Sequence, residues 1–171
     1  NTAIQKKKYQ KPKSLYKKFL SYYFDEIKKF KNTQQNYGLI NKKSFLNTKK
    51  YLNDLKNDRN IEVLYGGDAS IKNNQYYVEP TLLNCKKHNN NAFGKEYFAP
   101  ILSCYVYEDK NLDKAVNLCI NNSYALTGSV FSDNKKFIEN FTNDSMFSCG
   151  NYYINDKSCL LYTSPSPRDM M

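Results

Sequence analysis

Side chains able to act as nucleophiles or metal ligands are widely separated in this sequence. The chain of 171 residues has five cysteines and one histidine: Cys85, Cys104, Cys119, Cys149, Cys159 and His88. No two cysteines form a CxxC pair, and a lone histidine cannot complete the usual zinc ligand sets, so the spacing of a metal site is absent. We interpret the thiols as small buried apolar groups with one or two at the surface. This usage fits a reducing compartment better than a disulfide framework.

Two amphipathic helices are predicted in the first third of the chain. Apolar side chains recur near helical spacing from Lys13 to Lys29, directly after Pro12. The polar segment 32–38 ends in glycine and is expected to be a loop. Asn41 is a suitable cap for a second helix, whose lysines would face solvent. The apolar side of this helix is predicted to hold Phe45, Leu46, Tyr51, Leu52 and Leu55.

The rest of the chain alternates between apolar runs and amphipathic segments. The expected strands are Ile61–Tyr65, Pro100–Tyr107, Leu126–Ser132 and Gly150–Asn155, with helices after residue 107 and at Asn134–Asp144. Gly66-Gly67 marks a turn, and Pro80 prevents residues 76–83 from forming one continuous central strand. Strand–helix alternation from Pro100 onward predicts parallel pairing with right-handed crossovers. The expected fold class is α/β, with one mainly parallel sheet flanked by helices.

The net charge of +10 invites a nucleic-acid interpretation, but the kind of basic residue argues against it. Only Arg59 and Arg168 are arginine among 26 basic residues, although arginine is the residue that pairs bidentately with phosphates and guanine. The abundant Lys, Asn, Tyr, Ile and Phe share AT-rich codons, so a base-composition bias explains the charge. No run approaches the roughly 18 apolar residues of a membrane span, and residues 1–8 lack a signal-peptide core. Neither a nucleic acid nor a membrane is expected as a partner.

Five short motifs follow one another between residues 66 and 158. They are Gly66-Gly67, YVEPT at 77–81, EYFAPILS at 96–103, YALTGSVF at 124–131 and GNYYINDKS at 150–158. In this order and spacing they resemble the motifs of the aldehyde dehydrogenase family. The strand PILSCYVY and the last two motifs resemble the glutamate-semialdehyde (1-pyrroline-5-carboxylate) dehydrogenases of proline breakdown. Residues 1–158 are therefore predicted to be part of an aldehyde dehydrogenase catalytic domain.

The resemblance implies a reaction and its cofactor. In this family a cysteine thiolate attacks the aldehyde, a hydride passes to NAD, and a glutamate-activated water hydrolyses the thioester. The expected partners are a small aldehyde and further copies of the same protein. An intracellular location is expected, in the mitochondrial matrix for a eukaryotic protein and in the cytoplasm otherwise.

Two positions match family residues that bind NAD. Glu96 stands where a carboxylate accepts hydrogen bonds from the nicotinamide ribose hydroxyls, and Phe98 where a phenylalanine packs beside the nicotinamide ring. Taken alone, Glu96 would be an exposed loop acid, and its place before the FAP block favours the cofactor role. Ala99 replaces a family glycine and would be strained if the turn needed a positive φ. The segment 155–158 either leads to the substrate-anchoring loop or is an ordinary charged turn.

The family nucleophile has no counterpart in this sequence. Counting back without gaps from the PKSL block at 12–15 places it at or beside Ala3, and residues 1–4 contain no cysteine. The glutamate base and the dinucleotide-binding domain of the family precede the nucleophile. The chain by itself is therefore expected to be an inactive fragment of a dehydrogenase. The alternative is a non-catalytic paralogue with an oligomerisation or regulatory role.

Residues 159–171 differ in composition from the rest of the chain. The segment CLLYTSPSPRD at 159–169 resembles the translation of a transposase-type sequencing adapter, and the whole stretch lacks Lys and Asn. We predict a non-native, extended tail. A native Ser/Pro-rich linker or PxxP ligand is the alternative.

Overall fold

The computed structural model describes residues 7–32, 38–88, 91–95, 97–121 and 126–156. They belong to two units, residues 1–112 and 113–171. Three sets of sequence predictions fall outside the described residues: the nucleophile position near Ala3, the carboxylate of Glu96, and the tail 159–171 with the two residues before it.

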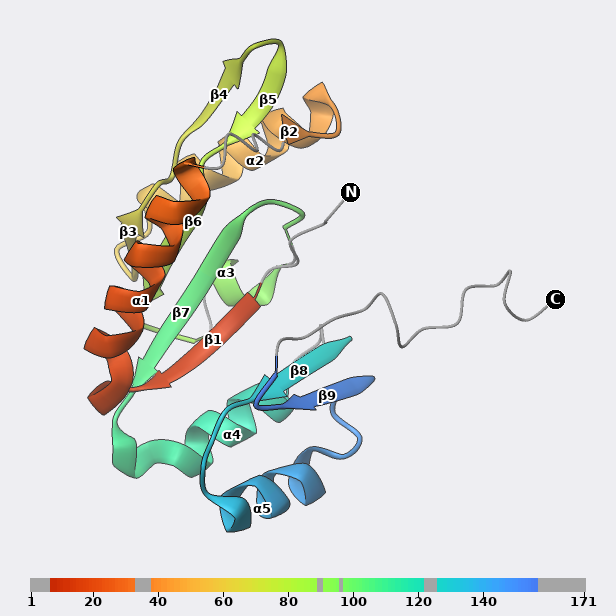
Figure 1. Cartoon of the computed structure of the whole chain (residues 1–171). Coiled ribbons are helices and arrows are strands. Elements are labelled where there is room, and N and C mark those ends of the chain that lie inside the picture. Colours follow the sequence, from red (N-terminus) through yellow and green to blue (C-terminus); the bar gives the residue numbers. More distant parts are fainter. Residues whose placement is uncertain (1–6, 33–37, 89–90, 96, 122–125, 157–171) are drawn as a thin grey trace, which may run out of the picture. The chain divides into compact units, whose positions relative to one another are not determined.

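A four-stranded sheet forms the centre of the first unit (Figure 1). Its strands are β1 (Lys7–Pro12), β7 (Ile101–Tyr107), β6 (Thr81–Cys85) and β3 (Ile61–Tyr65), in that spatial order. β7 pairs in parallel with both β1 and β6, whereas β3 pairs antiparallel with β6. Leu82 and Leu83 of β6 point to opposite faces and are both 0% exposed, so this strand is covered on both sides.

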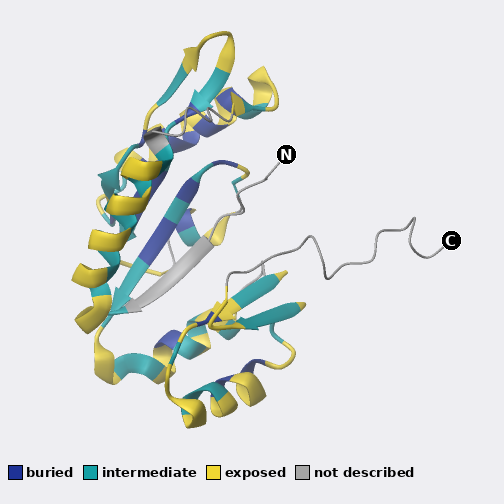
Figure 2. Ribbon diagram, viewed as in Figure 1, coloured by how far each residue is buried: buried dark blue, intermediate teal, exposed yellow. Residues whose placement is uncertain are grey.

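Helices cover the two faces of this sheet. α1 (Lys13–Asn32) packs on one face, where Phe24 meets Tyr65 with ring centroids 6.2 Å apart. Burial raises the pKa of the Tyr23 hydroxyl, and Cys104 of β7 adds to the effect. α2 (Lys42–Lys56) and the short α3 (Asn91–Gly94) belong to the other face, where α2 contributes its buried side to the main core. The outer sides of α1 and α2 are exposed (Figure 2).

A second, smaller sheet packs against α2. It consists of β2 (Gly38–Leu39), β5 (Gln75–Val78) and β4 (Ala69–Lys72), all antiparallel. The β4–β5 hairpin turns at Asn73 and Asn74, whose φ values of 49° and 61° suit a tight hairpin turn. Phe45 of α2 lies on Tyr76 of β5, with ring centroids 5.3 Å apart. The helix begins as predicted, because the Asn41 side chain accepts a 2.8 Å hydrogen bond from the Ser44 N–H.

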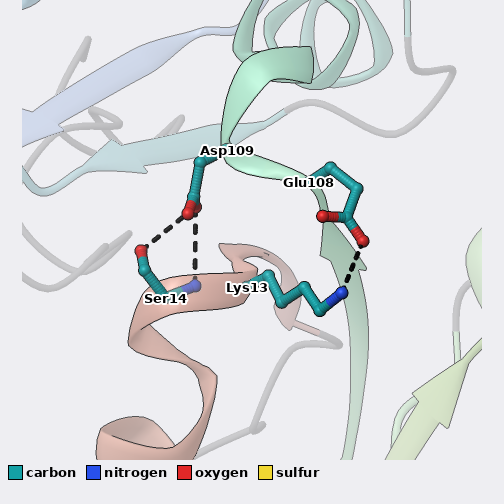
Figure 3. Close-up of polar contacts among 4 residues, drawn as sticks. All are labelled: Lys13, Ser14, Glu108 and Asp109. Atoms are coloured by element: carbon teal, nitrogen blue, oxygen red, sulfur yellow. Dashed lines mark hydrogen bonds and ion pairs between the residues drawn. The ribbon is translucent and has the colours of Figure 1, made fainter.

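Polar contacts join the ends of β1 and β7. The parallel register sets Pro12 beside Tyr107, so α1 starts next to the turn that follows β7. Lys13 Nζ lies 2.9 Å from Glu108 Oε1 (Figure 3). The Ser14 hydroxyl and N–H both donate to Asp109 Oδ1, at 3.0 and 3.5 Å. Asp109 therefore caps α1 from a distant segment and places a negative charge at the positive end of the helix.

In the second unit, strands and helices alternate. α4 (Leu112–Ile120), which follows the 3₁₀ turn η1 (Asp109–Asn111), is succeeded by β8 (Thr127–Val130), α5 (Lys135–Ser145) and β9 (Asn151–Ile154). β8 and β9 pair in parallel, with Gly128 beside Tyr152. The Tyr152 ring packs edge-on against Phe141 of α5, and its hydroxyl lies 2.6 Å from the Ser148 hydroxyl.

The α/β class is confirmed, and the pairs β1–β7, β6–β7 and β8–β9 are parallel, in agreement with a mainly parallel arrangement. The described strands form three sheets, of which the β8–β9 pair is one. Ile61–Tyr65 has the predicted bounds but runs antiparallel to its neighbour, because the chain returns through the β4–β5 hairpin before β6 begins after Pro80. The helices at 13–29 and 134–144 are confirmed as α1 and α5. β1 was missed, since KKYQKP lacks an apolar alternation and joins the sheet through its backbone.

The cap on α1 yields the first prediction. Replacing Asp109 with alanine should lower the free energy of unfolding by about 0.5 to 1 kcal/mol, because it removes the acceptor for both Ser14 donors. Asp109→Asn keeps an acceptor oxygen and should lose less. Urea unfolding followed by circular dichroism measures both variants. Equal losses in the two would show that Asp109 does not act as a cap.

The close contact between β8 and β9 at Gly128 yields the second prediction. A β-carbon at Gly128 would lie 2.6 Å from Cε1 of Tyr152, a ring that Phe141 and Ser148 hold in place. Gly128→Ala should therefore lower the free energy of unfolding by about 1 to 3 kcal/mol. Gly94→Ala is the matched control, because a β-carbon at Gly94 meets nothing within 4 Å. Thermal unfolding that is equally unaffected in both variants would contradict the packing described.

Candidate functional site

Three of the five motifs meet at the amino ends of β6 and β7. Thr81, which is 0% exposed, connects them. Its N–H donates to the Pro100 carbonyl at 2.8 Å. Its hydroxyl accepts from the Gly67 N–H at 2.9 Å and donates to the Glu79 carbonyl at 2.8 Å. One buried side chain thus ties the GG turn and the YVEPT segment to the FAPILS segment, and it satisfies buried backbone groups in doing so.

The turn after β3 depends on glycine. Gly66 has a φ of +69°, and a β-carbon there would collide with the Pro80 carbonyl oxygen. Only glycine meets both conditions without strain. Beside the turn, Lys56 Nζ lies 2.8 Å from Asp68 Oδ1, and this hydrogen bond and charge lower the pKa of the Asp68 carboxyl. The GG motif therefore has a structural role. It forms the bend at the end of β3, after which the chain passes through the β4–β5 hairpin and returns as β6 beside β3.

The segment from Tyr97 to Ile101 is tightly folded. The Ala99 N–H donates to the Tyr97 carbonyl at 2.9 Å, and the Ile101 N–H donates to the Ala99 carbonyl at 2.7 Å. Ala99 is 3% exposed and belongs to the main core. Positive φ values of non-glycine residues occur in the described chain at Asn73, Asn74 and Asn155. The strain considered for Ala99 therefore does not arise, and alanine is accommodated here.

Phe98 is exposed although both of its neighbours are packed. Its relative exposure is 68%, whereas Ala99 is buried and the Tyr97 ring stacks on Tyr51 of α2. The two rings are nearly parallel, with centroids 3.2 Å apart and an interplanar angle of 14°. An aromatic side chain held in this way offers its ring to a flat apolar group. The Phe98 ring is therefore exposed between two packed neighbours in the described part of the chain.

The other two motifs come together in the second unit as β8 and β9. Asn155, at φ 54°, follows β9 and acts as a clamp: its side-chain amide donates to the Ser132 carbonyl at 3.0 Å and accepts from the Ser132 N–H at 2.8 Å. Its own N–H donates to the Val130 carbonyl at 2.8 Å. Asp156 comes next and is exposed. Asn155 therefore has a structural role at the start of segment 155–158. The two interpretations of this segment also involve residues 157 and 158, which lie outside the described part.

The described cysteines differ in burial. Cys85 and Cys104 are 1% and 0% exposed, Cys149 is half-buried and Cys119 is exposed, as predicted for buried thiols with a few at the surface. Among the described residues, no group of three His, Cys, Asp or Glu side chains is placed to hold a metal ion. No described helix is both long and apolar enough to cross a membrane.

Sequence reasoning missed the roles of Tyr51 and Thr81. Tyr51 was predicted only as one of several apolar positions on a helix, and Thr81 only as part of a motif. The helical spacing of Tyr51 indicated burial, but nothing local to residue 51 pointed to Tyr97 as its partner.

Comparison with known proteins places these motifs in a family. Residues 5–165 match the sequence profile of the aldehyde dehydrogenase family. The chain is 41% identical over 120 residues to the probable delta-1-pyrroline-5-carboxylate dehydrogenase of Schizosaccharomyces pombe, with 70% of this chain covered. It is 36% identical over 124 residues to the mitochondrial delta-1-pyrroline-5-carboxylate dehydrogenase of Homo sapiens, with 71% covered. It spans 22% of the length of each of these relatives.

Solved structures show the same fold. The delta-pyrroline-5-carboxylate dehydrogenase of Mycobacterium tuberculosis superposes with a TM-score of 0.80 at 23% identity, over 92% of this chain and 31% of that one. A structure of that dehydrogenase bound with NAD superposes with a TM-score of 0.64 at 26% identity, over 75% of this chain and 23% of that one. With the family profile matched from residue 5 to residue 165, this chain belongs to the aldehyde dehydrogenase family.

Proposed function

We propose that this chain is part of an NAD-dependent aldehyde dehydrogenase that oxidises L-glutamate 5-semialdehyde, formed from 1-pyrroline-5-carboxylate, to glutamate in proline breakdown. The observation that carries the proposal is the 41% identity over 120 residues to a relative named for this activity. The complete protein is proposed to be a homo-oligomer. A mitochondrial location is proposed by analogy with the Dictyostelium discoideum and human relatives, whose names include that compartment.

Two residues of this chain are assigned to the nicotinamide end of NAD. Phe98 suits the role because its ring is exposed between two packed neighbours, where a planar ring can lie against it. Glu96 is assigned by its place in the EYFAPILS motif, since an ionised carboxylate accepts hydrogen bonds from ribose hydroxyls. The apolar ring and the charged acceptor would together fix the orientation of the nicotinamide.

The reaction defines what this chain has to contribute. Oxidation of the aldehyde consumes one water, releases a hydride and two protons, and leaves a carboxylate. NAD, when bound, supplies the acceptor for the hydride. The residues of this chain would bind and orient: Phe98 would support the ring, Glu96 would hold the ribose, and Thr81 fixes Pro100, two residues after Phe98, through its 2.8 Å hydrogen bond. A displacement of about 1 Å at such a site can cost on the order of a hundredfold in rate.

The second candidate is a non-catalytic paralogue that retains the fold for oligomer contacts or regulation. The observation that favours it is that residues 1–4 contain no cysteine, although spacing places the nucleophile at or beside Ala3. A methyl group cannot form a thiohemiacetal with an aldehyde. The complete protein decides between the candidates, because reduction of NAD by glutamate semialdehyde is possible only for the first.

The assignment of Glu96 and Phe98 yields a prediction for the complete protein. Phe98→Ala and Glu96→Gln should each slow hydride transfer, by up to about a hundredfold, and weaken NAD binding, with little change in the discrimination between aldehydes. Pre-steady-state NADH formation and NAD titration measure these effects. Phe147→Ala is the matched control, because Phe147 is 96% exposed and lies outside the motifs. If hydride transfer and NAD affinity were unchanged in Phe98→Ala and Glu96→Gln, the two residues could not be assigned to NAD binding.

The chain of 171 residues by itself should not oxidise aldehydes. Its share of the relatives is 22%, and the family base and dinucleotide-binding domain precede the nucleophile position. Ala3→Cys should not restore activity, because a thiol alone supplies neither part. The measurement is NADH absorbance after mixing the purified chain with NAD and glutamate semialdehyde. Steady NADH production would refute the expectation.

A further inference from the structure

A stacked tyrosine pair connects helix α2 to the segment that carries Phe98. Tyr51 is 6% exposed and lies among the buried residues of α2. Its ring faces that of Tyr97 with centroids 3.2 Å apart and an interplanar angle of 14°. Tyr97 is half-buried and packs against the main core to which Tyr51 belongs. The pair is the aromatic contact that the structure shows between this helix and the Tyr97–Pro100 segment.

Packing on both sides restricts Phe98. On its amino side Tyr97 is fixed by the stack with Tyr51, and on its carboxyl side Ala99 is 3% exposed. The hydrogen bond from the Ala99 N–H to the Tyr97 carbonyl, 2.9 Å long, closes the backbone around residue 98. With both neighbours fixed, the backbone dihedrals of Phe98 have little freedom, and these dihedrals determine which staggered rotamers its exposed side chain favours.

The support behind the stack is itself rigid. α2 begins at a side-chain cap on Asn41 and buries Phe45, Leu52 and Leu55 in the same core as Tyr51. A residue in the middle of such a helix cannot shift without disturbing these contacts. Tyr51 therefore serves as a fixed surface against which Tyr97 is placed.

We propose that Tyr51 is a positioning residue of the nicotinamide site: its ring, stacked on Tyr97, sets the direction in which Phe98 presents its own ring. The inference rests on the proposed role of Phe98. In this arrangement Tyr51 acts on Phe98 through Tyr97.

The ring of Tyr51, rather than its hydroxyl, carries this role. The hydroxyl is buried, and it makes no hydrogen bond of normal distance and angle within the part of the chain that the structure describes. Burial raises the pKa of this hydroxyl, and the neighbouring Tyr97 adds to the effect. Tyr51→Phe keeps the stack and removes only the hydroxyl, so it separates the contribution of the ring from that of the polar atom. Tyr51→Leu removes the flat face while leaving an apolar side chain in the core.

A first experiment measures the order of residue 98 without the cofactor. The chain contains no tryptophan, so Phe98→Trp introduces a single fluorescent indole at an exposed site. Tyr51→Leu in this background should lower the residual fluorescence anisotropy of the introduced indole, and Tyr51→Phe should restore it. Tyr22→Leu is the matched control, because Tyr22 is 63% exposed on α1. Tyr97→Leu removes the same stack at its half-buried partner and should lower the anisotropy as well. It replaces Tyr51→Leu in the experiment if Tyr51→Leu does not fold.

A second experiment measures the consequence in the complete protein. Tyr51→Leu should slow pre-steady-state hydride transfer by about ten- to a hundredfold and reduce kcat, with little change in the KM for the aldehyde. Tyr51→Phe should recover the rate. A loss of fold would instead lower the amount of active protein and leave the rate constant of the remainder unchanged.

The two experiments separate this inference from the proposed function. Unchanged anisotropy at residue 98 in Tyr51→Leu and in Tyr97→Leu overturns the positioning role, whatever Phe98 does in the enzyme. A hydride step that does not respond to Phe98→Ala overturns the proposed cofactor role, and the positioning role in that site with it. Reduced anisotropy together with slower hydride transfer in Tyr51→Leu, both reversed in Tyr51→Phe, supports the inference.

Discussion

The first unit is organised around the pairing of β6 with β7 at the point where both strands begin. The Thr81 N–H donates to the Pro100 carbonyl, and this bond sets the parallel register that places Thr81 beside Ile101. The Thr81 hydroxyl then holds the Gly67 N–H and the Glu79 carbonyl. Because Thr81 is 0% exposed, losing this hydroxyl would remove the acceptor of the buried Gly67 N–H, which costs about 1 to 3 kcal/mol. The hydrogen bond to Pro100 also positions the segment that bears Phe98, since Phe98 lies two residues before Pro100.

Helix α2 links that end of the sheet to the rest of the unit. Its buried side packs on the main sheet through Leu52 and Leu55 and on the second sheet through Phe45, while Tyr51 contacts Tyr97. One helix therefore contributes to the core, supports the β4–β5 hairpin and holds the segment before β7. Such shared use couples stability to site geometry, since a change in the α2 core shifts the surface on which Tyr97 rests.

Local chemistry made part of the structure predictable. Asn41 is a good cap wherever a helix follows, and Ile61–Tyr65 is an apolar run closed by glycines, so both predictions were confirmed. Pairing between distant strands has no local signal: β1 is a lysine-rich segment whose place follows from its backbone bonds to β7. The same limit applies to the site. Phe98 was found through its motif, whereas Tyr51 depends on a partner far along the chain, which helical periodicity cannot reveal.

Burial separates the residues that the fold requires from those that it does not. Gly66 is required by its positive φ and by the Pro80 carbonyl, and Thr81 by the backbone groups that it satisfies. At position 99, by contrast, the fold does not require glycine. Alanine replaces the family glycine there because the φ of this residue is not positive. Phe98 has no such structural reason: at 68% exposure it contributes little to the core, and a polar side chain would be better hydrated there. Exposure alone does not assign a ligand to this ring, because Phe147 is still more exposed at 96% and lies outside the motifs. The proposed role of Phe98 therefore rests on its place in the EYFAPILS motif, and the packing of Tyr97 and Ala99 adds a fixed backbone on which the ring stands.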